Sequence, residues 1–239
     1  MSFTFYGDLL GISSSYNLDA DLAYSKLNNF YNITFRELEK YCHAYPDSKV
    51  FMFSDSILFY GEESVAAIKH LQNLYLSLLS DNLLLRGAIV KDKLDFEPRF
   101  ELENFQKRLP INNTLSKAVS LQSLYKGSRL IIEVALAKEL LSDEPHWLTQ
   151  EGFISSPNSE SINSEFMKRI TPTPENRNYE YLYFWCSTHP NCQFDEIKKR
   201  KELEEISKMV DSSISIHYKE TIELIKRSNS RKKYVKQYS

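Results

Sequence analysis

The sequence predicts an α+β fold: a mainly antiparallel sheet of the split βαβ, ferredoxin-like kind, with helices on one face and a C-terminal helical extension. Over residues 1–145, short apolar segments of strand length alternate with segments whose apolar residues recur at helical spacing. Beyond that point the chain becomes rich in Ser, Pro and Asn, and then charged and helix-forming. We therefore expect a first domain over residues 1–145 and an extension over 146–239.

The first domain opens with an aromatic-rich apolar strand at residues 3–10, which ends at Gly11. A polar loop over residues 12–21 should follow, with Asp19 as the N-cap of the first helix. That helix is predicted by residues at a spacing of three or four: Leu27, Phe30, Tyr31, Thr34, Leu38 and Tyr41. The turn-forming segment "YPDSK" ends it.

The segment "FMFSDSILFY", residues 51–60, predicts a hairpin, because a Ser-Asp-Ser break separates two short apolar strands. A second amphipathic helix is expected over residues 62–80. The apolar segment 83–90 predicts another strand, and we expect residues 93–100 to pair with it.

The remaining elements are less regular in sequence. Residues 112–126 have helical spacing, and residues 129–136 read as a strand that runs into a short helix at 137–142. In the extension, the aromatic segment 179–187 predicts a strand, and residues 194–226 predict charged helical structure.

Charge and composition exclude several classes of partner. With 30 Lys and Arg against 32 Asp and Glu, the net charge is −2, which gives no general attraction to nucleic acid or to an anionic membrane. No apolar run approaches the length of a membrane span, no signal peptide is visible, and three cysteines do not make a disulfide framework. We therefore expect a soluble cytoplasmic protein without membrane or specific nucleic-acid partners.

Two carboxylates stand in apolar surroundings. Asp8 lies near the end of the first strand, and Asp55 lies at the turn of the hairpin. A strand–helix–hairpin order can bring both to one edge of the sheet, where two buried acids need a cation. Oxygen ligands suit Mg²⁺ or Mn²⁺. The alternative is that each aspartate only caps a turn.

Four segments, in this order and spacing, carry a family resemblance: "FYGDLLGIS", "FSDSILFY", "LLLRGAIV" and "LSKAVSLQSLYKGSRLIIE". Over residues 3–141 the chain resembles the palm-type catalytic domain of class III nucleotidyl cyclases, the adenylate and guanylate cyclases. It is most similar to the bacterial Pycsar pyrimidine cyclases of antiphage defence, in which an "SDS" hairpin precedes an "RGAI" strand.

The resemblance implies an enzyme that converts a nucleoside triphosphate, with CTP or UTP as candidates, to a 3′,5′-cyclic mononucleotide and pyrophosphate. It implies two Mn²⁺ or Mg²⁺ ions held by Asp8, Asp55 and the backbone carbonyl of Leu9. The phosphates would lie near Leu9, Leu10 and Gly11. The family works as a homodimer, and the product would switch on a cyclic-nucleotide-sensing effector after phage infection.

The chain departs from the family in one helix. The Asn and Arg that the family places there fall on Ser116 and Ser120, and the glycine before the helix falls on Asn112. Phosphoryl transfer needs a positive charge at the reacting phosphate. Three residues are candidates to supply it and to bind the nucleotide: Arg86, Lys117 and Arg129.

Arg86 stands out because it lies within an apolar strand and therefore needs a counter-charge. Asp8, Asp55, a bound phosphate or another acid would each serve. Without a replacement for the missing cation, the chain would instead be a catalytically degenerate cyclase-fold protein that binds a nucleotide or a partner in a regulatory role.

Overall fold

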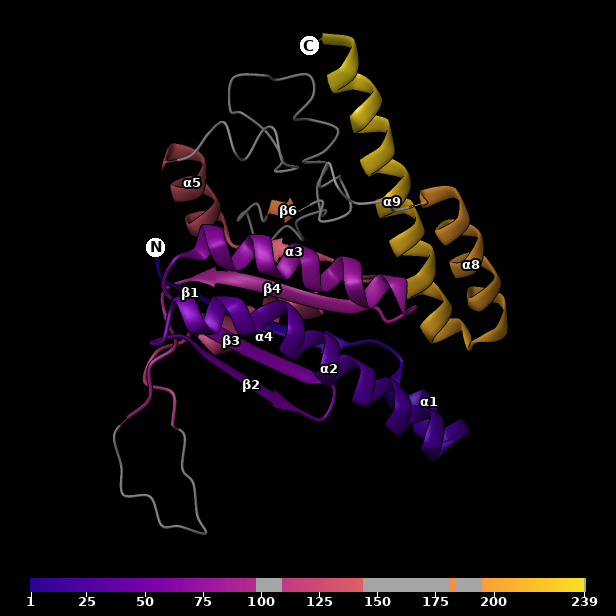
Figure 1. Cartoon of the computed structure of the whole chain (residues 1–239), viewed down its shortest axis with the longest axis horizontal. Coiled ribbons are helices and arrows are strands. Elements are labelled where there is room, and N and C mark those ends of the chain that lie inside the picture. The colour runs from indigo at the N-terminus through magenta and orange to yellow at the C-terminus, as the bar shows by residue number, and fades with distance from the viewer. Residues whose placement is uncertain (98–108, 144–180, 184–194, 239) are drawn as a thin grey trace.

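The computed structural model describes residues 1–97, 109–143, 181–183 and 195–238. Six strands form a single sheet in the order β2-β3-β1-β4-β5-β6 (Figure 1). β4 and β5 run parallel and every other neighbouring pair is antiparallel, which confirms the mainly antiparallel sheet. The strands are β1 Phe3–Leu9, β2 Lys49–Phe53, β3 Ser56–Gly61, β4 Leu85–Lys91, β5 Leu130–Ile132 and β6 Tyr181–Tyr183.

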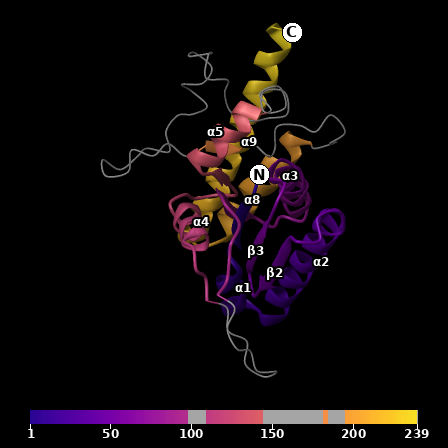
Figure 2. The same cartoon turned by 90° about the vertical axis from the view of Figure 1, so that its left-hand side faces the viewer.

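The helices lie in layers about this sheet. They are α1 Ile12–Leu18, α2 Ala20–Ala44, α3 Ser64–Ser80, α4 Thr114–Ser123, α5 Val134–Asp143, α8 Glu196–Met209 and α9 Ser212–Tyr238. The long helices α2 and α3 pack against each other and cover one face, as predicted. Figure 2 shows α4 on the other side of the sheet, where it contacts β1 and β4, so the prediction that helices lie on one face applies to α2 and α3 and not to α4.

Most local predictions for the first domain are confirmed. Asp19 caps α2, because its carboxylate accepts the N–H groups of Asp21 and Leu22 at 2.8 and 3.3 Å. The predicted loop at residues 12–21 is wrong, since α1 occupies most of it. Although the segment is mostly polar, Ile12 and Ser15 are buried on one face of the helix, and the Ser15 hydroxyl donates to the Gly11 carbonyl at 3.0 Å.

The predicted pairing of residues 93–100 with 83–90 is also wrong. Both edges of β4 are already occupied, by β1 and by β5. Within the described part of the segment, Phe96 instead forms an isolated bridge with Pro110. Residues 98–100 lie outside the described residues.

The core at the centre of the sheet depends on two facing glycines. Gly7 of β1 is the cross-strand partner of Gly87 of β4. A Cβ atom at Gly7 would lie 2.8 Å from the Phe5 ring, and one at Gly87 would lie 2.5 Å from it. The ring of Phe5, which is fully buried, therefore occupies the space that two side chains would otherwise need.

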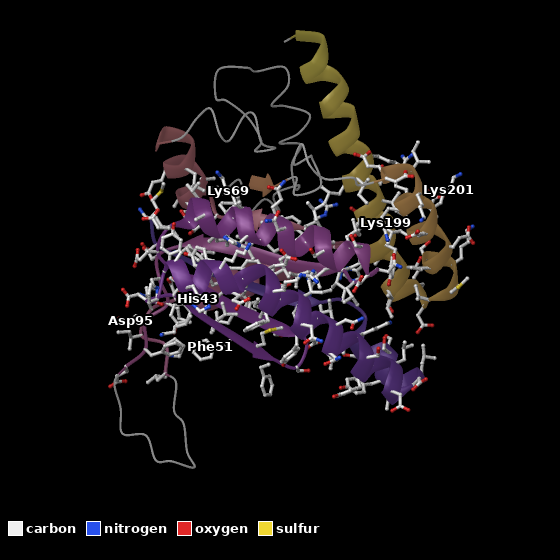
Figure 3. The ribbon with its side chains drawn as sticks, in the orientation of Figure 1. His43, Phe51, Lys69, Asp95, Lys199 and Lys201 are labelled. Atoms are coloured by element: carbon white, nitrogen blue, oxygen red, sulfur yellow. The ribbon has the colours of Figure 1, made fainter. Side chains whose placement is uncertain are left out.

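The C-terminal extension joins the first domain at several places. β6 adds a sixth strand beside β5, which confirms a strand within the aromatic segment, although residues 179–180 and 184–187 lie outside the described residues. The charged helical region is broken into α8 and α9, which pack together. Lys199 of α8, labelled in Figure 3, donates to the Ser80 carbonyl and to the Asn82 side chain at the end of α3, each at 3.2 Å.

Among the described residues, the structure contains no helix that is both long and apolar enough to cross a membrane.

Candidate functional site

Asp8 lies on the central strand between two cross-strand neighbours, Ser56 of β3 and Arg86 of β4. Such neighbours share a face of the sheet with their Cβ atoms close together. The Arg86 guanidinium donates from Nη2 to Oδ2 of Asp8 at 3.4 Å, and the Ser56 hydroxyl lies 3.5 Å from Oδ1. Tyr6 shares a hydrogen bond with the same hydroxyl at 3.0 Å. The register thus supplies the counter-charge that Arg86 needs, and it is Asp8.

The hairpin brings Asp55 to the end of β1. Its backbone carbonyl accepts the N–H of Leu9 at 2.8 Å, which ties the turn to the residue after Asp8. The preceding residue, Ser54, has a φ of 53°, the left-handed conformation that a tight turn uses. The two acids, far apart in the sequence, therefore lie at the same end of the sheet, beside the C-terminus of β1.

The electrostatics of Asp8 reflect this placement. Burial raises its pKa most, and the negative charge of Asp55 raises it further. The positive charge of Arg86, together with hydrogen bonds from Arg86 and Ser56, acts in the opposite direction. The net shift is upward, so the site disfavours a second negative charge and would gain from an added cation.

The donor set fits a cation that keeps most of its ligands from water or substrate. The described residues contain no group of three or more His, Cys, Asp or Glu side chains arranged to hold a metal. Mg²⁺ and its analogues commonly use only one or two protein carboxylates, together with waters and phosphates. Asp8 and Asp55 meet that requirement. Leu9 could add only its backbone carbonyl, because a leucine side chain has no atom that can bind a metal.

The segment after β1 is less available to phosphates than the sequence predicts. The N–H groups of Leu9 and Leu10 are already donated, to the carbonyls of Asp55 and Leu84, each at 2.8 Å. Gly11 has a φ of 83° and precedes α1, and its carbonyl accepts from Ser15. A role for these three residues in binding phosphate stays a prediction.

The three candidate cations lie in different surroundings. Arg86 contacts Asp8, and only 14% of its side chain is exposed. Lys117 of α4 lies 3.4 Å from Glu133. Arg129 donates to Glu220 of α9 and, at 2.7 Å, to the Lys126 carbonyl. Of the three, Arg86 is the one that the structure brings to the carboxylates.

The polar positions of α4 do not point into this cluster. Ser116 and Ser120 are exposed on the helix. Asn112 has a structural task, because its amide donates to the Lys93 carbonyl at 2.8 Å and its oxygen accepts from the Thr114 hydroxyl at 2.9 Å.

Sequence reasoning missed the turn that precedes β5 and its contact with α9. Arg86 donates from Nη1 to the Tyr125 carbonyl at 3.4 Å. In the same turn the Gly127 N–H donates to Nδ1 of His217 at 3.1 Å. These contacts join positions about 40 and 90 residues apart, so no local sequence pattern reveals them. The chain has only six glycines, and Gly127 was the one signal in the sequence that this turn has a special backbone.

His217 gives this part of the structure a pH dependence. Burial and the positive charges of Arg86 and Lys126 lower its pKa from 6.5 to about 4. The folded protein therefore keeps His217 neutral while the unfolded chain protonates it below about pH 6.5. Stability is fully present above that pH and falls between about pH 6.5 and 4.

We expect the free energy of unfolding, measured in urea, to fall more between about pH 7.5 and 5 in the wild type than in His217→Gln. The difference should be on the order of 1 kcal/mol after allowance for the partial exposure of the ring. Equal losses in the two proteins would contradict the assignment.

Solved structures share this fold. An adenylate cyclase from Trypanosoma brucei is 13% identical, covers 81% of this chain and 90% of its own, and superposes with a TM-score of 0.54. A second adenylate cyclase structure from T. brucei is 13% identical, covers 76% of this chain and 87% of its own, and has a TM-score of 0.53. The adenylyl cyclase CyaB from P. aeruginosa is 16% identical, covers 59% of this chain and 81% of its own, and has a TM-score of 0.50.

The chain has the fold of these adenylate cyclase structures. This cyclase fold confirms the α+β prediction at the level of architecture. No family model and no curated protein matches the chain. The finer resemblance to pyrimidine cyclases therefore stays a hypothesis.

Proposed function

We propose that this chain is a nucleotide cyclase that converts a nucleoside triphosphate to a 3′,5′-cyclic mononucleotide and pyrophosphate, with CTP and UTP as the first candidate substrates. The proposal rests on one observation: in a cyclase fold, the hairpin and the first strand bring Asp8 and Asp55 close enough that one acid raises the pKa of the other. Two neighbouring carboxylates of this kind can bind a divalent cation that also takes a phosphate oxygen as a ligand.

In the proposed reaction, the 3′-hydroxyl oxygen bonds to the α-phosphorus, and the bond from that phosphorus to the bridging oxygen of the β-phosphate breaks. Pyrophosphate leaves, and the hydroxyl proton passes to solvent. Asp8 and Asp55, with the Leu9 carbonyl, would hold two Mg²⁺ or Mn²⁺ ions. When bound, such ions activate the hydroxyl and neutralise phosphate charge.

Arg86 supports a negatively charged ligand at this place. Its Nε atom is buried and has no hydrogen-bond partner in the described part of the chain. A buried donor without a partner is costly, and a phosphate oxygen would satisfy it. In this role the guanidinium stabilises charge that develops in the transition state.

We further propose a homodimer, in keeping with the family resemblance. A role of the product as a signal in antiphage defence, read by an effector, is proposed from the sequence resemblance.

A regulatory protein that binds nucleotide without turnover is the second candidate. It is favoured by the serines at positions 116 and 120, and by the fact that the N–H groups of Leu9 and Leu10 are already engaged. Nucleotide binding by calorimetry, in the absence of any product, would select it.

The deciding experiment incubates the purified chain with each of the four nucleoside triphosphates and Mn²⁺ or Mg²⁺. We expect metal-dependent release of pyrophosphate and a cyclic mononucleotide identified by mass spectrometry. If none of the four gives product in a sample whose metal content and oligomeric state are verified, the cyclase proposal is wrong.

A further inference from the structure

α9 packs directly on the turn that precedes β5. Gly127, at the centre of this turn, has a φ of +84°, and a Cβ atom there would lie 2.9 Å from Cβ of Glu220. Its N–H donates to Nδ1 of His217. Because the lowered pKa of His217 keeps the ring neutral, Nδ1 is available as an acceptor. The turn therefore packs directly on α9, with no room for a side chain at position 127.

The next two residues of the turn are held by the same helix. The N–H of Ser128 donates to the Thr221 hydroxyl at 2.8 Å, and this hydroxyl donates in turn to the His217 carbonyl at 2.7 Å. Thr221 is fully buried. The Arg129 guanidinium forms an ion pair with Glu220. Three successive residues of the turn thus bond to three residues within five positions of α9.

The same turn also holds the backbone on both sides of Arg86. The Ser128 hydroxyl donates to the Leu85 carbonyl at 2.8 Å, and the Gly87 N–H donates to the Arg129 carbonyl at 2.8 Å. Both bonds come from residues that α9 itself contacts. A displacement of α9 would therefore be transmitted to the strand residues that flank Arg86.

The guanidinium of Arg86 completes the connection. Nη1 donates to the carbonyl of Tyr125 in the same turn, and Nη2 donates to Asp8. Both distances are 3.4 Å, longer than the usual range of about 2.7–3.2 Å, so a small movement of the turn is enough to break the contact with Tyr125 and to release the guanidinium from its place beside Asp8. The path from α9 to Asp8 passes through groups with defined partners at every step.

We propose that α9 positions Arg86 against Asp8, with Thr221, His217 and Glu220 as positioning residues. This inference rests on the proposed function in that it assigns the C-terminal extension a regulatory role at the phosphoryl-transfer site. The extension then controls the site through the strand backbone and the guanidinium, and anything that lifts α9 from the turn lowers turnover.

The test compares Thr221→Val, which keeps the shape of the side chain and removes the hydroxyl, with Thr221→Ser, which restores the hydroxyl. Ile33→Val on α2 serves as a control that loses buried carbon away from the site. The first measurement is hydrogen exchange of the Arg86 Nε–H by NMR on ¹⁵N-arginine-labelled protein, with the signal assigned by its absence in Arg86→Lys.

We expect exchange at Arg86 to be at least about tenfold faster in Thr221→Val than in the wild type, because protection reports local opening. Thr221→Ser and Ile33→Val should keep the wild-type rate. In an active preparation, kcat should fall by about tenfold in Thr221→Val, the equivalent of about 1.4 kcal/mol, with KM within about twofold.

Unchanged exchange in folded Thr221→Val, or an equal increase in Ile33→Val, would overturn the inference and leave α9 a packing element. Exchange needs neither substrate nor metal, so faster exchange in a chain that turns over no nucleotide would support the inference while the cyclase proposal fails. If Thr221→Val does not fold, Glu220→Gln replaces it, since this change removes the ion pair with Arg129 at a partly exposed position. Faster exchange at Arg86 in Glu220→Gln would then support the inference, and an unchanged exchange rate would overturn it.

Discussion

Replacing either acid with its amide should abolish turnover while leaving the fold intact. In Asp8→Asn and Asp55→Asn, we expect kcat to fall by about 10³-fold or more, because each change removes a charged ligand from the proposed cation site. Asp55→Asn should be at least as stable as the wild type, since it removes the repulsion that raises the pKa of Asp8. Product formation and thermal unfolding are measured on the same samples.

Asp19→Asn is the matched control for this pair. It makes the same chemical change at the N-cap of α2, where asparagine caps as well as aspartate. Mn²⁺ binding, followed by calorimetry, should be lost in the two site variants and kept in the control. Retention of both binding and turnover in either site variant would remove that carboxylate from the mechanism.

Replacing Arg86 should have the second-largest effect. We expect Arg86→Gln to lower kcat by about 10²-fold, because the variant loses the positive charge nearest the acids. It should also be less stable by about 2 kcal/mol, since Asp8 loses its ion-pair partner in a half-buried position. Arg86→Lys should recover part of the activity, because an ammonium keeps the charge but cannot bond Asp8 and Tyr125 in the same geometry.

Lys117→Gln separates the candidate cations. Lys117 pairs with Glu133 at an exposed position, so its removal should leave kcat within about threefold of the wild type. If Lys117→Gln instead loses as much activity as Arg86→Gln, the cation that serves the reaction lies on α4.

The predictions that succeeded depend on short-range patterns. Asp19 is recognisable as a cap because it precedes a helical repeat, and the hairpin around Asp55 is recognisable because two apolar runs flank a polar break. The placement of Asp8 beside Asp55 followed from the order of elements. The cap and the hairpin are visible within about twenty residues of chain, whereas Asp8 and Asp55 lie 47 positions apart and could be placed together only from the order of the elements.

The predictions that failed or stayed open depend on distant segments. Residues 93–97 resemble a strand, but β5 had already taken the free edge of β4. The partner of Arg86 was open until the register set it opposite Asp8. The bond between Thr221 and Ser128 spans 93 residues, and no local pattern marks either residue as a partner of the other.

The glycine pair in the core has a consequence for the acid and the base on the reverse side of the sheet. Gly7 and Gly87 are the immediate chain neighbours of Asp8 and Arg86, and successive residues of a strand point to opposite sides. Backbone hydrogen bonds set the spacing of β1 and β4, so the Phe5 ring, packed over both glycines, can affect Asp8 and Arg86 only by displacing the strand backbone that carries them. A bulkier residue at position 87 would need a smaller one at position 5, so the volumes at positions 5, 7 and 87 should be coupled, and a mismatch would displace the backbone next to Asp8 and Arg86.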